Sequence, residues 1–101
     1  MIAICAIIKD CYSDYLIEWI NYHRNIGVDK FIIYDNESEI PIKDVLFEYS
    51  NSVVVNNING LNMQVKTYNH CINNYKSDFD WIIFIDDDEF IVCENIKEFL
   101  N

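Results

Sequence analysis

The sequence predicts an α/β protein, a Rossmann-like open parallel sheet with flanking helices. Residues 2–8, 30–34 and 81–85 are nearly continuous apolar runs, as expected for strands that are buried on both faces of a parallel sheet. Segments with helical spacing of apolar residues separate these runs, so that strands and helices alternate along the chain. The length of 101 residues allows one domain, over residues 1–101.

The first half of the chain has the order strand, helix, strand. Ser13 or Asp14 is a candidate N-cap for a helix whose apolar stripe includes Trp19 and His23. Gly27 is suited to end that helix in the left-handed conformation. The pattern is therefore typical of a parallel crossover unit, with Trp19 and His23 in the core.

The second half continues the alternation. Residues 39–52 are expected to form a loop with a short helix around residues 44–49. The remaining elements expected are a strand at 53–55, a helix at 62–75, a strand at 81–85 and a last short helix at 94–100.

Composition excludes several classes of protein. Seventeen acidic side chains against seven basic ones give a net charge of −10, which excludes nucleic acid as a partner because phosphate backbones require a positive surface. The apolar run at the N-terminus is too short for a membrane span. The four cysteines form no Cys-x-x-Cys pair and lie mostly in apolar stretches, so we expect free thiols and a cytoplasmic protein.

Acidic residues follow three of the predicted strands. Asp10 and Asp35 each come after a strand, and residues 86–89 are four consecutive carboxylates directly after the most apolar strand. Ligands of open parallel sheets bind at the carboxyl ends of the strands, and a hard divalent cation would relieve the repulsion among the acids. The alternative is a solvated acidic turn without a ligand. Spacing alone leaves both interpretations open.

The motifs around these acids resemble a known family. The chain is similar to the nucleotide-sugar-binding half of GT-A glycosyltransferases of the family 2-like and family 92 type, which carry an Asp-x-Asp-Glu-Phe signature. The matching motifs extend over nearly the whole chain and occur in the same order as in the family. The resemblance is carried by Glu18-Trp19 with Tyr22-His23, Gly27 to Phe31, Tyr34-Asp35-Asn36-x-Ser38, Gln64 with Tyr68 to Cys71, and Phe84-Ile85-Asp86-x-Asp88-Glu89-Phe90-Ile91.

The resemblance implies a role for each matched position. Asp86 and Asp88 would hold Mn²⁺ or Mg²⁺ on the diphosphate of a nucleoside-diphosphate sugar, and Asp86 would also assist at the ribose. Asp35 and Gln64 would line the nucleotide pocket. Lys9-Asp10-Cys11 departs from the family's Lys-Asn-Glu, so only Asp10 is kept as a nucleotide contact.

The expected function is therefore donor binding in a metal-dependent, inverting glycosyltransferase. The acceptor site and the general base are expected to lie outside these residues, which makes the chain poorly active alone. An alternative is a non-catalytic assembly module that forms homo-oligomers through exposed apolar surface. A receiver-like phosphotransfer domain is a third possibility, but it requires a lysine after a later strand that this chain does not have. Glu89 either stabilises its own loop or contacts a ligand, and His70 is either a surface or a functional residue.

Overall fold

A computed structural model describes residues 1–100 and contains one four-stranded sheet. All strand pairs are parallel and the strand order is β3-β2-β1-β4, which confirms the predicted α/β class. The elements are β1 (Ile2–Ile8), α1 (Ser13–Asn25), β2 (Lys30–Asn36), α2 (Ile42–Val45), the 3₁₀ turn η1 (Phe47–Tyr49), β3 (Val53–Ile58), α3 (Gln64–Tyr75), β4 (Trp81–Phe84) and α4 (Ile96–Leu100).

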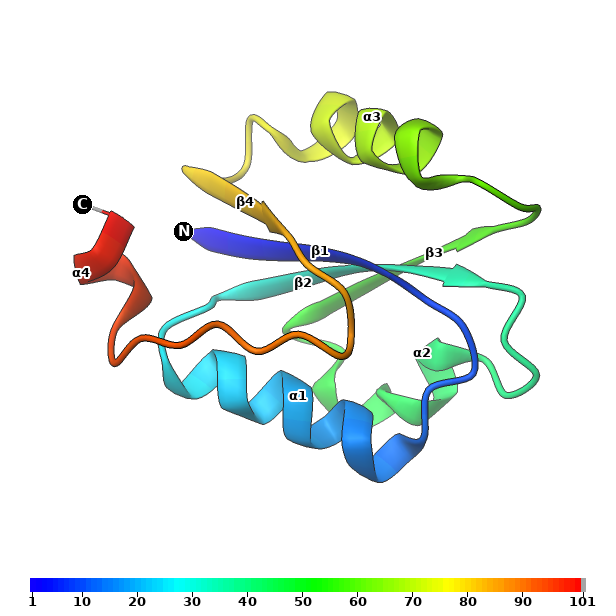
Figure 1. Ribbon diagram of the computed structural model, residues 1–101, viewed down its shortest axis with the longest axis horizontal. Helices are drawn as coiled ribbons and strands as arrows, with labels where there is room; N and C mark the ends of the chain where they lie inside the picture. Colours follow the sequence, from blue (N-terminus) through cyan, green and yellow to red (C-terminus); the bar gives the residue numbers. More distant parts are fainter. Residues whose placement is uncertain (101) are drawn as a thin grey trace.

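Helices cover both faces of the sheet. Figure 1 shows α1 and α2 on one face and α3 on the other. The central strand β1 contributes side chains to both cores. Ile4 and Ile8 belong to the core beneath α1, whereas Ala3 and Cys5 belong to the core beneath α3. This burial on both sides explains why the N-terminal run shows no polar alternation.

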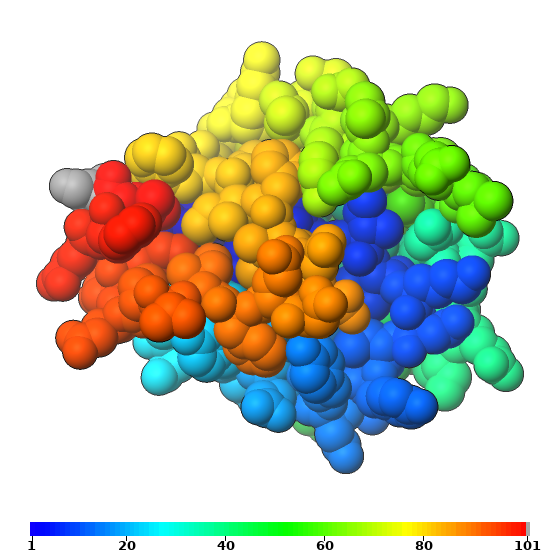
Figure 2. Space-filling model, in the orientation of Figure 1, coloured from blue at the N-terminus to red at the C-terminus, as the bar shows by residue number. Residues whose placement is uncertain are grey.

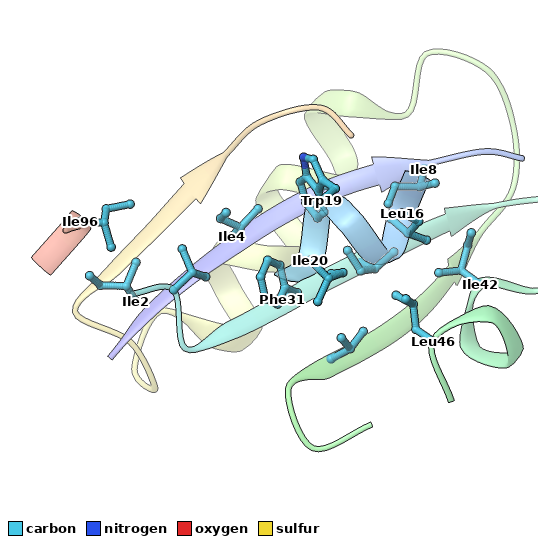
Figure 3. Packing of buried hydrophobic residues seen from close by; sticks show 14 residues of the cluster. Ile2, Ile4, Ile8, Leu16, Trp19, Ile20, Phe31, Ile42, Leu46 and Ile96 are labelled. Atoms are coloured by element: carbon cyan, nitrogen blue, oxygen red, sulfur yellow. The ribbon is translucent and has the colours of Figure 1, made fainter. Parts of the chain in front are cut away.

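The larger core lies between α1 and the sheet. Leu16, Trp19 and Ile20 are fully buried on the helical stripe predicted from the sequence. Figure 3 shows these side chains against Ile4 and Phe31, and the rings of Trp19 and Phe31 are 5.6 Å apart. The core position predicted for Trp19 is thus confirmed.

Several predicted boundaries differ in the structure. Strands β2 and β3 run further than expected, to Asn36 and Ile58, because each continues to pair with its neighbour. Strand β4 ends at Phe84, one residue early, and the last helix begins at Ile96. The predicted side-chain cap of α1 is wrong, since Tyr12 occupies the N-cap position and makes no side-chain cap hydrogen bond.

The segment after β4 has no helix or strand until α4. It runs back along α1 and places α4 beside the amino-terminal end of the sheet (Figure 1). The Ile96 amide donates to the Ile26 carbonyl at 2.8 Å, next to Gly27. Gly27 has φ +114°, as predicted for a left-handed helix end, and a Cβ there would lie 3.3 Å from Ile96.

No helix within residues 1–100 combines the length and the apolar character that crossing a membrane requires.

Candidate functional site

The acidic residues after β4 form a compact turn. Asp86, Asp88 and Glu89 each place one carboxylate oxygen within 4.8 Å of the others. The turn is closed by the Glu89 amide, which donates to the Asp86 carbonyl at 3.1 Å, and by the Asp86 amide, which donates to Glu89 Oε1 at 2.8 Å. Glu89 thus stabilises its own loop and also contributes a carboxylate to the group. We call residues 86–89 the acidic turn.

Asp87, the fourth acidic residue of the run, lies apart from the other three carboxylates. Asp87 is not part of the carboxylate group and is half-buried beside Cys11. Burial, followed by the hydrogen bond and the charge of Asp87, raises the pKa of Cys11 to about 12. The backbone turns at Asp87 and Asp88, which separates Asp87 from the other three acids.

The negative charges of the acidic turn repel one another. Burial and then the charges of Glu89, Asp88 and Asp87 raise the pKa of the Asp86 carboxyl above its ordinary value. A divalent cation would relieve this repulsion, and a set of carboxylate oxygens suits hard cations such as Mg²⁺ and Mn²⁺. The donor chemistry therefore fits the metal that the sequence motif implies.

Three side chains of α1 hold the end of the acidic turn and the segment that follows it. Trp19 Nε1 donates to the Glu89 carbonyl at 2.8 Å, and the Tyr22 hydroxyl donates to the Ile91 carbonyl at 2.6 Å. The Ile91 amide in turn donates to His23 Nε2 at 3.2 Å. We call these three hydrogen bonds the α1 clamp.

The α1 clamp fixes the tautomer of His23. Its Nδ1 lies 2.9 Å from the Trp19 carbonyl, which can only accept, so Nδ1 carries the hydrogen. Nε2 must then be unprotonated to accept from the Ile91 amide. His23 is fully buried, as predicted, and this burial lowers its pKa. The clamp therefore requires neutral His23.

Phe90 anchors the same segment by packing. Its ring stacks on His23 at 5.7 Å and meets Tyr15 and Tyr22 edge-on at 6.1 and 5.0 Å. Figure 2 shows the segment after β4 in orange, between α3 residues in yellow-green and the start of α1 in blue. The backbone that carries the acidic turn is thereby fixed to the core.

Asp10 and Asp35 belong to a second network, at the ends of β1 and β2. Asp35 is 4% exposed, and its two carboxylate oxygens accept from the Ser38 and Ile42 amides at 3.1 and 2.9 Å. The Asp10 amide donates to Ser38 Oγ at 3.0 Å, and Asp10 Oδ1 accepts from the Glu39 amide at 2.7 Å. In this structure both acids order the loop after β2, and their contact with a nucleotide stays a prediction.

Gln64, which the family resemblance predicts to line the nucleotide pocket, begins α3 and is exposed. Its Nε2 donates to the Tyr68 hydroxyl at 3.2 Å, and the Tyr68 ring packs on Phe84 with centroids 4.4 Å apart. Gln64 is thus connected through Tyr68 to the end of the strand that precedes the acidic turn. Its nucleotide contact also stays a prediction.

Sequence reasoning did not find the roles of the clamp residues. Tyr22 and His23 form part of the motif, but nothing in their spacing shows that they bind a backbone almost 70 positions away. The only available signal was that polar-tipped aromatic residues on a buried stripe need hydrogen-bond partners.

Comparison with known proteins identifies the family of the chain. The sequence profile of glycosyltransferase family 92 matches residues 2–101. The chain belongs to glycosyltransferase family 92. Similar family 92 proteins come from Oryza sativa subsp. japonica, with 32% identity over 93 residues, Ricinus communis, with 33% over 81, and Arabidopsis thaliana, with 34% over 82.

The aligned regions cover 87%, 77% and 77% of this family 92 chain but only 15%, 14% and 14% of those relatives. The chain thus spans about a seventh of the length of the relatives that it matches. No solved structure matches it significantly.

Proposed function

We propose that this chain is the donor-binding part of a metal-dependent glycosyltransferase and binds a nucleoside-diphosphate sugar with Mn²⁺ or Mg²⁺. The observation that carries the proposal is the acidic turn, in which the carboxylates of Asp86, Asp88 and Glu89 gather at the carboxyl end of the sheet. This is the edge at which open parallel sheets bind their ligands. Membership of family 92 supports transfer of a sugar.

Each residue would contribute through binding and orientation. Asp86 and Asp88 would hold the cation, which when bound stabilises the negative charge of the leaving diphosphate. Glu89 keeps the turn closed through its bond to the Asp86 amide. Asp10, Asp35 and Gln64 are the proposed contacts to the nucleotide, and Asp86 also assists at the ribose.

The rest of the reaction requires other residues. An inverting transferase needs a general base within hydrogen-bond reach of the acceptor hydroxyl. We place this base and the acceptor site in the part of the family 92 proteins that this chain does not span. The described residues alone are therefore expected to bind a donor and to transfer sugar poorly. The four thiols are free, in keeping with a proposed cytoplasmic location.

Calorimetry with the purified chain tests donor binding. Uridine and guanosine diphosphates are titrated with 1 mM MnCl₂ or with EDTA, and we expect heat only when the metal is present. Asp88→Asn should abolish that heat. Asp78→Asn, which removes an exposed acid outside the acidic turn, should leave it unchanged. A folded protein that gives no heat with any nucleotide and metal would contradict the proposal.

A second candidate function is assembly through apolar surface. Leu61 and Val65 are 88% and 73% exposed near the start of α3. Exposed apolar side chains of this size mark interaction surfaces when they gather. Analytical ultracentrifugation separates the two candidates, since an assembly module should form homo-oligomers at high concentration, whereas a monomer at every concentration would disfavour assembly.

A further inference from the structure

A hollow lies under α3, at the side of the sheet away from β4. It has a volume of about 280 Å³ and lies between the first turns of α3 and the carboxyl ends of β2 and β3. We call it the α3 pocket. Its wall includes Tyr34, Asn57, Ile58, Lys66, Thr67 and His70.

Thr67 supplies the pocket with an unsatisfied polar group. The residue is 2% exposed, and its Oγ1 atom has no hydrogen-bond partner in the structure. A helical threonine often donates to the carbonyl three or four residues earlier, but the Thr67 hydroxyl makes no such bond here. Because buried hydroxyls are nearly always paired, an unpaired one in a pocket wall points to a polar ligand.

The neighbouring side chains are suited to an anion. Lys66 adds a cation, and the Tyr34 hydroxyl lies 2.7 Å from His70 Nδ1, which leaves Nε2 of that ring for a ligand. No acidic residue lines the pocket within residues 1–100, although the chain has seventeen acids and seven basic residues. Charge and hydrogen-bonding capacity therefore both favour a negatively charged ligand group.

The rest of the wall is partly apolar and also includes Asn56 and Asn57. Ile58 and Met63 line the pocket together with the ring of Tyr34. The volume corresponds to about nine water molecules at liquid density, which suits a compact organic molecule. A ligand with an apolar or aromatic body and one anionic head matches both parts of the wall.

The α3 pocket is separate from the acidic turn. The pocket wall comes from β2, β3 and α3, whereas the acidic turn follows β4, and β1 lies between β2 and β4. Neighbouring strands are about 4.8 Å apart, so that β2 and β4 are separated by about 10 Å. None of the residues of the acidic turn lines the pocket.

We propose that the α3 pocket is a second ligand site, which binds a small organic anion through Thr67, Lys66 and His70 without the metal of the acidic turn. The anionic head is a carboxylate or a phosphate, bound by the hydroxyl and the two basic side chains. Its apolar body packs on Ile58 and Met63. The site does not depend on the proposed donor function.

Amide NMR spectra of the ¹⁵N-labelled chain in EDTA test this site. Benzoate and phenyl phosphate are the probes, and benzamide is the neutral control. We expect saturable shifts at residues 56–58 and 63–70 with at least one anionic probe, and at least tenfold weaker binding of benzamide. The probe that binds more tightly identifies the head group.

Two variants assign the contacts. Thr67→Val keeps the side-chain shape and removes the unpaired hydroxyl, so it should weaken probe binding at least fivefold without lowering the melting temperature. Lys66→Gln should weaken binding as well, and Lys76→Gln, after the end of α3, is its matched control. Asp88→Asn should have no effect on the probes.

Three results would overturn the site. They are the absence of saturable shifts in the pocket, equal binding of benzamide and the anions, and loss of probe binding in Asp88→Asn. The last result would assign the pocket to the acidic turn. Because EDTA removes the metal, failure of the donor proposal cannot produce any of them.

Discussion

The substitution Asp88→Asn should stabilise the metal-free protein and at the same time abolish its response to Mn²⁺. Asp88 has carboxylate neighbours in Asp86 and Glu89, with oxygens within 4.8 Å. Two unit charges at that distance repel by about 0.9 kcal/mol across water, so the two pairs together amount to roughly 1.7 kcal/mol before salt screening. With screening, removal of one charge should raise the free energy of unfolding by about 1 kcal/mol.

Thermal unfolding followed by circular dichroism measures both effects. At low ionic strength with EDTA, a gain of about 1 kcal/mol raises the melting temperature of a domain of this size by about 4–8 °C. In 1 M NaCl the gain should nearly vanish, because the screening length falls to about 3 Å. Added Mn²⁺ should raise the melting temperature of the wild-type chain and leave that of Asp88→Asn unchanged.

Asp78→Asn is the matched control, because it makes the same change of charge outside the acidic turn. Its melting temperature in EDTA should rise by less than that of Asp88→Asn. A lower melting temperature for Asp88→Asn in EDTA, or equal stabilisation of wild type and variant by Mn²⁺, would refute the reasoning that the carboxylates repel one another and share a cation.

Three further predictions concern the residues that support the site. Tyr22→Phe removes the 2.6 Å bond to Ile91, and it should cost about 1 kcal/mol in urea unfolding and weaken Mn²⁺ binding measured by calorimetry. Asp35→Ala leaves two loop amides without their carboxylate acceptor and should lower the free energy of unfolding by about 2–3 kcal/mol in the same assay. A loss near zero would show that the loop is stable without these two hydrogen bonds. The lowered pKa of His23 means that, just below its ordinary value of 6.5, the unfolded chain binds a proton that the folded chain excludes. Stability should therefore fall as pH drops below about 6.5, and His23→Gln should flatten that pH dependence.

The fold was largely predictable from the sequence because burial on both faces of a parallel sheet leaves a clear pattern. The run at residues 2–8 has apolar side chains at successive positions, and in the structure they alternate between the two cores. The stripe of Trp19 and His23 likewise indicated the buried face of α1. These signals are local, so they can be interpreted without knowing which segments meet.

The candidate site was predictable only in part. The run at 86–89 indicated a place for a cation, but it did not show that Asp87 faces Cys11 while Glu89 joins the other two acids. The ends of β2 and β3 were predicted too early, because polar residues such as Asp35 interrupt the apolar pattern while backbone pairing continues. The unpaired hydroxyl of Thr67 could not be predicted from the sequence, since it depends on how α3 packs on the sheet.

The α1 clamp has a consequence for the order in which the molecule assembles. Its hydrogen bonds join residues 68 to 70 positions apart. The segment that they hold, between β4 and α4, forms no strand pairing and no helix of its own. Closing so long a loop is entropically costly, and the contacts that compensate exist only once α1 has docked on the sheet. Amide protons around Ile91 should therefore exchange with deuterium sooner than those of β1, and the proposed affinity for the cation should arise in the last stage of folding.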